Sequence, residues 1–433
     1  MSKREIVRAI KGMNDILPFV TEDFLQSQIW KDICRAAEDA FEGYGYQMVY
    51  LPVVEDTQLF VRGVGEGTDI VSKEMYSFED RGGRQLTLRP EGTAGAVRAY
   101  IEYNFSHHQP VQRWWYMGPM FRAERPQKGR YRQFYQIGAE FFGVDSVDSD
   151  VELLCMLNRF FNALNLDTIT LRINSLGDEQ SRKDYEESLR TFFNGIKADF
   201  KEDLYVRMQT NPLRFLDSKV FRQSAHAQNA PDIIDSLSPE SRGRLEEVLS
   251  GLDRAGVPYE RDPTLVRGLD YYNHTVFEFS TQDLGAQDAI GGGGRYDSLV
   301  AELGGPEIPA VGFAAGIERL ALLLASKNQA YSPIDLYVVP MEGYSGEALA
   351  LAEAIRDCGN AKIEVDLTGA RLKAMFKRAD KIGARKAIVL GESEKDAGKV
   401  LLKDLQIRDA EREVALDPQV IHDELMIKDG RKG

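Results

Sequence analysis

The hydrophobic positions in the first three quarters of the chain fall into separate blocks of helical and strand periodicity. Apolar residues three and four apart predict helices near 22–43 and 147–164, and a third helix starts near Glu91. Between them, short alternating runs predict strands and hairpins. Because these elements come in blocks rather than in regular alternation, we predict an α+β body around an antiparallel sheet of about six or seven strands.

Two hairpins can be placed from the sequence. MYSFEDRGGRQLTLRPEG predicts one that turns at Arg81–Gly83, and the runs RWWYMGPMF and FYQIGAEFFG predict a second one around residues 122–132. YQMVYLPVVE predicts a further strand, but its Pro52 lacks the N–H group that a sheet ladder needs. We therefore expect that strand at a sheet edge or at an interface.

The rest of the chain changes character twice. From about 178 to 254 the sequence is charged and favours helices, which indicates a helical module inserted into the body. A polar linker at 327–333 is followed by alternating strands and helices over 334–433. Such alternation predicts a small α/β domain. The predicted organisation is a body of residues 1–326, which contains the insertion, and a terminal α/β domain.

The composition indicates the class of protein and the compartment in which it is expected. A chain of 433 residues with 43% apolar and 28% charged residues is typical of a globular protein with more than one core. No apolar run approaches the roughly 20 residues of a membrane span, and the polar start MSKREIVRAIKG lacks the core of a signal peptide. Three separated cysteines without a C-x-x-C pair favour a reducing compartment. We expect a cytoplasmic protein.

The net charge of −14 argues against general nucleic-acid binding, yet the cations are clustered. Arginine suits phosphate because its planar fork makes paired hydrogen bonds and keeps its proton. A second basic cluster lies on the helix predicted in ARLKAMFKRADKIGARK. Both clusters fit selected contacts with a polyanion, although a solvated basic surface gives the same pattern. The first cluster, on the second hairpin, consists of Arg122, Arg125, Lys128, Arg130 and Arg132.

Several common catalytic motifs do not occur in the sequence. The run Gly291–Gly294 lacks the Lys and Ser/Thr of a P-loop, VGEGTD is not a dinucleotide fingerprint, and there is no G-x-S-x-G elbow. The five histidines show no metal-ligand spacing, and we assign no metal-binding side chain. We expect this run to form a loop, in which four consecutive glycines still require a close approach of the backbone, either to a ligand or to another strand. The arginines and carboxylates at strand ends are typical of electrostatic transfer at phosphorus.

Several of these segments resemble class II aminoacyl-tRNA synthetases. MFRAERPQKGRYRQF is similar to their motif 2, and AVGFAAGIERL is similar to their motif 3. LVRGLDYYNHTVFEF and GGGGRYD resemble the two peptides characteristic of histidyl-tRNA synthetases, and KGMNDILP and TLRPEGTAG fit the same family. The resemblance implies an antiparallel-sheet catalytic domain with an inserted helical module, followed by a C-terminal α/β anticodon-binding domain.

The resemblance also implies a reaction, the ATP-dependent ligation of L-histidine to tRNA(His). Histidine and ATP would give histidyl-adenylate and pyrophosphate, and histidine would then pass to the 3′ end of the tRNA. Arg122 would hold the α-phosphate, and Arg267, the second catalytic residue, would bridge that phosphate and the histidine carboxylate. Mg²⁺ would neutralise the remaining charge of a bent ATP. The other residues implied to bind ATP are Glu124, Arg130 and Arg319.

For the amino acid, the resemblance implies a pocket that pairs both ring nitrogens. Glu140 and Tyr272 would hold the imidazole, Tyr271 would line the pocket, and nearby acceptors would receive the α-ammonium group. Such a pocket rejects analogues that lack the ring nitrogens by roughly ten-thousandfold. The residues implied to bind histidine are Glu91, Gly92, Thr93, Gln136, Glu140, Arg267, Tyr271 and Tyr272.

Contacts with tRNA and with a second chain are implied as well. Arg125 and Gln127, in the motif 2 loop, would contact the acceptor end, and the basic helix near Lys373 would lie in the anticodon-binding domain. Members of the family are homodimers, and YQMVYLPVVE with its helix resembles the interface-forming motif 1.

Two alternatives remain open from the sequence. One is a noncatalytic, synthetase-like regulatory subunit of ATP phosphoribosyltransferase in histidine biosynthesis. Such paralogues usually lack the terminal domain and often the catalytic arginine, whereas this chain has residues beyond Ile334 and has Arg267. The other is a different synthetase of the same subclass, which RGLDYYNHTVFEF disfavours.

Overall fold

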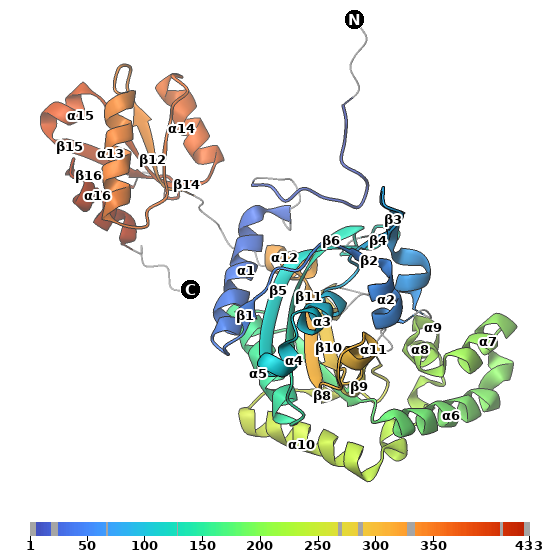
Figure 1. Cartoon of the computed structure of the whole chain (residues 1–433). Coiled ribbons are helices and arrows are strands. Elements are labelled where there is room, and N and C mark those ends of the chain that lie inside the picture. The colour runs from blue at the N-terminus through green and yellow to red at the C-terminus, as the bar shows by residue number, and fades with distance from the viewer. Residues whose placement is uncertain are drawn as a thin grey trace, which may run out of the picture. The chain divides into compact units, whose positions relative to one another are not determined.

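The computed structural model divides the chain into two compact units, Met1–Lys327 and Asn328–Gly433 (Figure 1). Within the described residues, no helix is long and apolar enough to cross a membrane. The residues described are 6–18, 25–65, 68–127, 129–266, 271–284, 289–326, 334–407 and 410–427.

The first unit is built on an eight-stranded sheet with the order β1-β5-β6-β11-β10-β9-β7-β8. Its six central strands are antiparallel, and the two-residue strands at the edges pair in parallel, β1 with β5 and β8 with β7. The predicted α+β class is confirmed, and the two short edge strands bring the sheet beyond the predicted six or seven. The strands are β1 (Gln47–Met48), β5 (Gln112–Phe121), β6 (Gln133–Phe142), β7 (Thr170–Ser175), β8 (Glu260–Arg261), β9 (Asn273–Ser280), β10 (Ala289–Arg295) and β11 (Ala310–Gly316).

The sheet separates two hydrophobic cores, because alternate residues of each strand point to opposite faces. On β6, Ala139 and Phe141 belong to one core, whereas Phe142 belongs to the other. The first core is covered by α1 (Ser27–Glu42), α5 (Asp148–Ala163) and α12 (Ile317–Ser326). The second is covered by α3 (Thr93–Glu102), α11 (Leu299–Glu302) and part of the helical segment described below.

The predicted strand at 46–55 is divided between two sheets, which corrects the single-strand interpretation. Its start forms β1, and its end forms β2 (Val54–Asp56) in a three-stranded sheet with β4 (Gln85–Leu88) and β3 (Tyr76–Glu79). Pro52 lies between the two pieces, where the missing N–H group interrupts the ladder. The hairpin predicted to turn at Arg81–Gly83 is confirmed as β3 and β4.

The glycine run forms a central strand rather than a loop. β10 lies between β9 and β11, and a Cβ atom at Gly293 would lie 1.9 Å from the carbonyl oxygen of Gly312 on β11. Of the two explanations for this run, close approach to another strand is therefore confirmed. Gly291 and Gly292 of the same strand also line the cleft described below.

The segment after β7 is mostly helical, as the sequence predicts. The N-terminus of α6 and the N-terminus of α10 meet at Asp178, whose carboxylate accepts hydrogen bonds from the N–H of Ser181 at 2.7 Å, from the hydroxyl of Ser238 at 2.6 Å and from that of Ser241 at 3.0 Å. These bonds hold the start of α6 against the start of α10. The helices are α6 (Glu179–Ile196), α7 (Glu202–Thr210), α8 (Pro212–Asp217), α9 (Lys219–Arg222) and α10 (Pro239–Ala255).

The second unit contains a five-stranded mixed sheet with the order β13-β12-β14-β15-β16. Its first three strands are parallel, as the alternating pattern predicts, and a C-terminal antiparallel hairpin adds two more. Helices cover both faces (Figure 1). The elements are β12 (Ile334–Pro340), α13 (Ser345–Cys358), β13 (Ile363–Val365), α14 (Leu372–Lys381), β14 (Ala384–Leu390), α15 (Glu392–Ala397), β15 (Lys399–Asp404), β16 (Glu411–Ala415) and α16 (Pro418–Met426).

Candidate active site

A cleft of about 550 Å³ opens on the sheet face that carries the second core. Its floor consists of β6, β10 and β11, and its rim includes the loop between β5 and β6, the π-helix Ile70–Glu74 and α8. Gly92, Arg125, Gln127 and Glu140 do not line it, and Arg267 lies outside the described residues. The predicted site residues that do line it are Glu91, Thr93, Arg122, Glu124, Arg130, Gln136, Tyr271, Tyr272 and Arg319.

The loop of the β5–β6 hairpin is fixed at its base by backbone hydrogen bonds. The N–H of Arg122 donates to Arg132 across the hairpin at 2.9 Å, and the N–H of Ala123 donates to Glu74 at 2.7 Å. Arg132 in turn donates its N–H to Gly12 at 2.7 Å, which attaches the N-terminal KGMNDILP segment. The loop therefore enters the cleft at a defined place, although Arg125 and Gln127 themselves are exposed.

Arg122 is held inside the cleft. Its Nε donates to the carbonyl oxygen of Pro90 at 3.0 Å, and its guanidinium carbon lies 5.2 Å from the ring centre of Phe134. Burial lowers the pKa of Arg122, and the carboxylates of Glu124 and Glu74 oppose that shift. Since an arginine in a protein keeps its proton, Arg122 is a half-buried cation that lines the cleft.

Two further arginines reach the same cleft from different elements. Arg130 forms an ion pair with Glu124 at 3.2 Å across the hairpin loop. Arg319, from the first turn of α12, donates to the carbonyl oxygens of Ala289 and of Gly129, the latter at 3.4 Å. Segments about 190 residues apart thus bring guanidinium groups to one cavity, an arrangement suited to a polyphosphate.

Glu91 lies at the N-terminus of α3. Its two oxygens accept the N–H groups of Thr93 at 2.6 Å and Ala94 at 3.0 Å, so the carboxylate caps the helix. Burial raises the pKa of Glu91, while these two N–H groups and Arg122 act in the opposite direction. A carboxylate has more acceptor sites than two bonds occupy, so Glu91 can also receive an ammonium group in the cleft.

Glu140 lies behind the cleft wall and is fully buried. It accepts hydrogen bonds from the hydroxyls of Thr93 at 2.8 Å and Tyr116 at 2.9 Å, and from Tyr296. Burial raises its pKa to about 8, against the effect of the three hydroxyls. Through Thr93, which lines the cleft, Glu140 is one hydrogen bond away from the cavity.

The floor also presents an acceptor and two aromatic rings. Gln136 on β6 lines the cleft, and its buried Oε1 has no hydrogen-bond partner among the described residues. A buried acceptor of this kind is costly unless a ligand or water occupies it. Tyr271 and Tyr272 also line the cleft, with ring centres 4.6 Å apart, and both are buried by more than nine tenths.

Several residues of the cleft had no signal in the sequence. Glu318, next to Arg319, accepts the N–H of Tyr135 at 3.0 Å, and burial raises its pKa to about 8. Glu74 is directed into the cleft by the π-helix, and its pKa is raised by burial and by Glu124. π-Helices are rare and frequently occur at functional sites, but their i→i+5 bonding leaves no simple sequence pattern. Other additions are Asp69, Arg214, Asp217 and Glu278.

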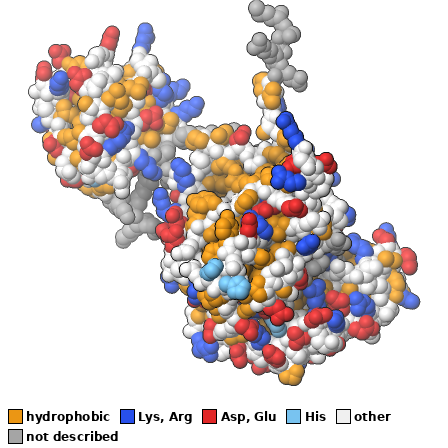
Figure 2. Space-filling view, in the orientation of Figure 1, with side chains coloured by type: hydrophobic (Ala, Val, Ile, Leu, Met, Phe, Trp, Pro, Cys, Tyr) orange, Lys and Arg blue, Asp and Glu red, His pale blue; other side chains and the backbone are white. Residues whose placement is uncertain are grey.

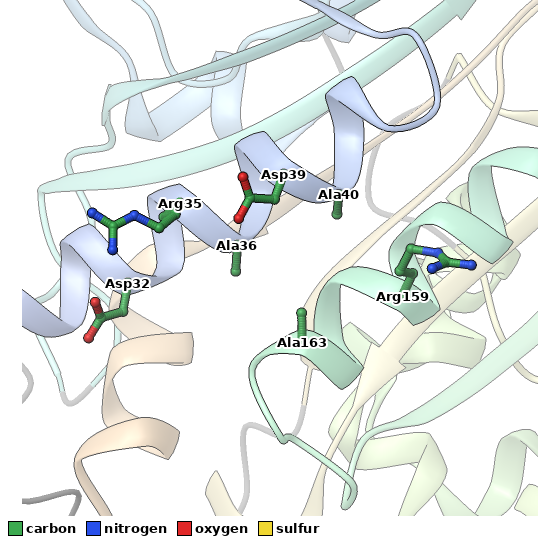
Figure 3. A pocket seen from close by; sticks show the side chains of 7 residues that line it. All are labelled: Asp32, Arg35, Ala36, Asp39, Ala40, Arg159 and Ala163. Carbon is green, nitrogen blue, oxygen red and sulfur yellow. The ribbon is translucent and has the colours of Figure 1, made fainter. Parts of the chain in front are cut away.

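A second cavity, of about 390 Å³, lies between α1 and α5 (Figure 3). Ala36 and Ala40 face Ala163 across it, and charges of both signs surround it on Asp32, Arg35, Asp39 and Arg159. Neither sign prevails, so this cavity shows no preference for a charged ligand. Among the described residues, no group of three or more His, Cys, Asp or Glu side chains could hold a metal ion.

Comparison with known proteins shows to which family the chain with this cleft belongs. Residues 20–320 match the family described as Histidyl-tRNA synthetase. The chain belongs to that family. Residues 335–420 match the Anticodon binding domain, so the resemblance predicted from the motifs is confirmed for both parts of the chain.

Individual relatives agree with this assignment. The chain is 47% identical over 403 residues to a histidine–tRNA ligase of Synechococcus elongatus, covering 92% of this chain and 91% of the relative. It is 46% identical over 423 residues to one of Hydrogenovibrio crunogenus, covering 96% of both chains. The crystal structure of apo S. aureus histidyl-tRNA synthetase matches with a TM-score of 0.75 and 34% identity, covering 96% of this chain and 99% of that one. The predicted class II synthetase fold is therefore confirmed.

Proposed function

We propose that the cleft activates histidine with ATP and then transfers it to tRNA(His), with the predicted side chains in the roles given below. The reaction follows from the family: the chain is a histidine–tRNA ligase that uses ATP as a substrate. The regulatory-subunit alternative is not favoured, because residues 335–420 match an anticodon-binding domain.

In the activation step, the histidine carboxylate attacks the α-phosphate of ATP and pyrophosphate leaves. Arg122 stabilises the charge that develops on the α-phosphate, and Arg130 and Arg319 hold the outer phosphates. Arg267 bridges the carboxylate and the α-phosphate, as the family resemblance implies. Chemistry of this kind needs positioned cations rather than a covalent protein intermediate, which agrees with a cavity rich in guanidinium groups.

The histidine side of the cleft supplies acceptors for the α-ammonium group and partners for the imidazole. Glu91 and Gln136 receive the ammonium group, with Thr93 beside them. Tyr272 donates to one ring nitrogen, and Glu140 accepts from the other once histidine displaces part of its hydroxyl shell. The observation that carries this proposal is the buried, unpartnered Oε1 of Gln136 in a cavity that Arg122 and Arg319 also line.

Mg²⁺ accompanies ATP in this proposal. The described residues offer no cluster of three ligands, so the ion would be held mainly by phosphate oxygens and water, with Glu124 and Glu278 as nearby carboxylates. When bound, the ion neutralises charge on the phosphates. The chain's own contribution is to hold ATP in place.

Both units of the chain are proposed to contact tRNA. Arg125 and Gln127 contact the acceptor end from their exposed loop, and the unit Asn328–Gly433 binds the anticodon, with Arg371, Lys373 and Lys377 at the basic start of α14. We also propose a cytoplasmic location.

A homodimer is proposed from the exposed edge of the large sheet. Tyr50 is 85% and Tyr103 is 68% exposed, and both line a depression of about 470 Å³ beside β1. Figure 2 shows hydrophobic side chains interrupting the charged surface of the first unit. An uncovered sheet edge with aromatic neighbours is suited to pairing with a second copy.

Pyrophosphate exchange into ATP, measured with each amino acid in turn, tests the proposal. We expect exchange with histidine alone, and a loss of about a hundred- to thousandfold in Arg122→Ala. Arg62→Ala, which changes an arginine in the last turn of α2 (Thr57–Val64) outside the cleft, is the control and should retain activity. Exchange with another amino acid, or equal rates in both variants, contradicts the assignment.

A further inference from the structure

Strand β9 begins with a bulge, directly after the two tyrosines of the cleft. Arg295 of β10 pairs with Asn273, but the residue before Arg295 pairs with Val276, so β9 has two extra residues at this point. One of them, His274, has a φ of +44°, a left-handed conformation that costs energy for a residue with a side chain. Bulges bend a strand and redirect the side chains next to them, and the surrounding structure must hold such a conformation in place.

The positions of both tyrosine rings depend on where β9 begins. Tyr271 and Tyr272 line the cleft and immediately precede Asn273. The ring of Tyr272 packs against β10, where a Cβ atom at Gly294 would lie 2.9 Å from its Cδ1. The ring centre of Tyr271 lies 5.7 Å from that of Tyr296, whose hydroxyl donates to the carboxylate behind the cleft wall. A shift of the first residue of β9 would therefore move both rings.

The side chain of Asn273 holds this first residue through Asp297. Its amide nitrogen donates to Oδ2 of Asp297, and its amide oxygen accepts the backbone N–H of Asp297, both at 3.2 Å. Oδ1 of Asp297 accepts the N–H of Ala310 at 3.0 Å and a hydrogen bond from Nη1 of Arg295 at 3.1 Å. Both polar atoms of the Asn273 side chain are thus bonded to one residue, which is itself fixed by two other donors.

Arg295 anchors this pair in the interior of the first unit. Its side chain is fully buried and forms an ion pair at 3.0 Å with Asp150 on α5, which is buried as well. Because Arg295, Tyr296 and Asp297 are consecutive, one short segment holds α5, the carboxyl group of Glu140 and the start of β9. A buried cation is costly to separate from its carboxylate partners, so this segment is a fixed point to which the bulge is attached.

We infer that Asn273 and Asp297 are positioning residues of the histidine pocket, because their pair determines where Tyr271 and Tyr272 enter the cleft. The inference rests on the proposed function, in which Tyr272 donates to the imidazole. Neither Asn273 nor Asp297 lines the cleft, so both act through the tyrosines. The described arginines proposed to hold ATP lie on the β5–β6 hairpin and on α12, so the pair should affect histidine binding more than ATP binding.

Pyrophosphate exchange, measured with varied histidine and with varied ATP, tests this inference. In Asn273→Ala, which loses both hydrogen bonds, we expect the KM for histidine to rise about tenfold and the KM for ATP to stay within about twofold. Asn273→Asp keeps the shape of the side chain but places a carboxylate against that of Asp297, and should raise the KM for histidine at least as much.

An exchange of the two side chains should rescue the pocket. Asn273→Asp combined with Asp297→Asn again places an amide opposite a carboxylate, with the same net charge, and the new amide oxygen can still accept from Arg295 and Ala310. We expect the double variant to recover most of the KM for histidine that Asn273→Asp loses. A general loss of stability would not be reversed by this exchange in the KM for histidine alone.

Asn194→Ala is the matched control. Asn194 lies on α6 outside the cleft, and its Oδ1 accepts the hydroxyl of Tyr205 at 2.6 Å. Its removal should leave both KM values unchanged. Equal rises of the two KM values in Asn273→Ala, an unchanged KM for histidine, or a double variant no better than Asn273→Asp would contradict the inference. If the unsubstituted protein shows no histidine-dependent exchange, the proposed function itself fails.

Discussion

The hydroxyl of Tyr116 donates to Oε1 of Glu140 over 2.9 Å, and the ring of Tyr116 fills the space beside two glycines. A Cβ atom at Gly92 or Gly138 would lie 2.2 or 2.5 Å from that ring. Gly92, which the family resemblance places in the histidine site, thus has a physical reason to be glycine. It allows a buried tyrosine to reach the carboxylate behind the cleft.

Removal of this hydroxyl should weaken histidine binding. In Tyr116→Phe, Glu140 loses a hydrogen-bond donor that favours its ionised form, so the pKa of Glu140 should rise further. A smaller fraction of the protein then has an ionised Glu140 that can accept the imidazole N–H. We expect the KM for histidine in pyrophosphate exchange to rise about tenfold near neutral pH, with partial recovery at about pH 9.

Tyr46→Phe provides the control for this substitution. Tyr46 is equally buried, and its hydroxyl has no hydrogen-bond partner among the described residues. Its removal should leave the KM unchanged and the protein at least as stable. Equal KM values for histidine in Tyr116→Phe and Tyr46→Phe at both pH values would contradict a role for the Tyr116 hydroxyl.

The same carboxyl group should make stability depend on pH. Burial raises the pKa of Glu140 from its ordinary value of 4.5 to about 8, so between these values the native state holds a proton that the unfolded chain releases. Stability therefore falls as the pH rises through this window, by up to about 1.4 kcal/mol per pH unit for one group. Glu318, with a pKa of about 8, contributes in the same direction.

Glu140→Gln should reduce that slope. We expect the thermal midpoint of Glu140→Gln, relative to that of the unsubstituted protein, to increase as the pH is raised from about 5 to about 8, because the amide does not ionise. Melting curves of the ligand-free protein at several pH values give the difference directly. A difference between the two proteins that stays constant across this range would mean that Glu140 is ionised throughout.

The sequence predicted the fold well where hydrophobic periodicity is long. The ten-residue strands β5 and β6 and the 16-residue helices α1 and α5 were found, because each carries several repeats of its period. The short parallel edges β1 and β8 have two residues each and carry no period. The sequence predicted a loop at β10, because glycine has no side chain that could show the alternation of a strand. Its glycines are nevertheless needed there, because the backbone at Gly312 comes too close to leave room for side chains.

The sequence predicted some residues of the cleft and missed others. Arg122, directly after β5, and Arg319, in the first turn of α12, both line the cleft, because each is positioned by a regular element with a fixed register. Glu74 and Arg214 were missed, since their positions depend on a π-helix and on the packing of α8. The prediction for Arg267 stays a prediction.

Gly312 on β11 should not tolerate a side chain. A Cβ atom there would lie 1.7 Å from Oε2 of Glu140, the oxygen that accepts the hydrogen bond from the hydroxyl of Tyr296. We expect Gly312→Ala to destabilise the protein by about 2 kcal/mol or more and to impair histidine activation. Gly95→Ala is the comparison: the new methyl group would be 3.7 Å from its nearest neighbours, and alanine favours the helix interior by about 0.5–1 kcal/mol. Thermal melts of the two variants should shift in opposite directions, and a stable, active Gly312→Ala would show that Glu140 moves freely.

The proposed dimer interface can be tested at Tyr50. An arginine there would place a charge in an apolar contact without disturbing the fold, because the side chain is 85% exposed in the single chain. We expect light scattering to give the mass of a dimer for the unsubstituted protein and a concentration-dependent shift to monomer for Tyr50→Arg. Val206→Arg, at a 51% exposed position on α7, should leave the dimer intact. A monomeric unsubstituted protein, or a dimer that Tyr50→Arg does not weaken, would move the interface away from the β1 edge.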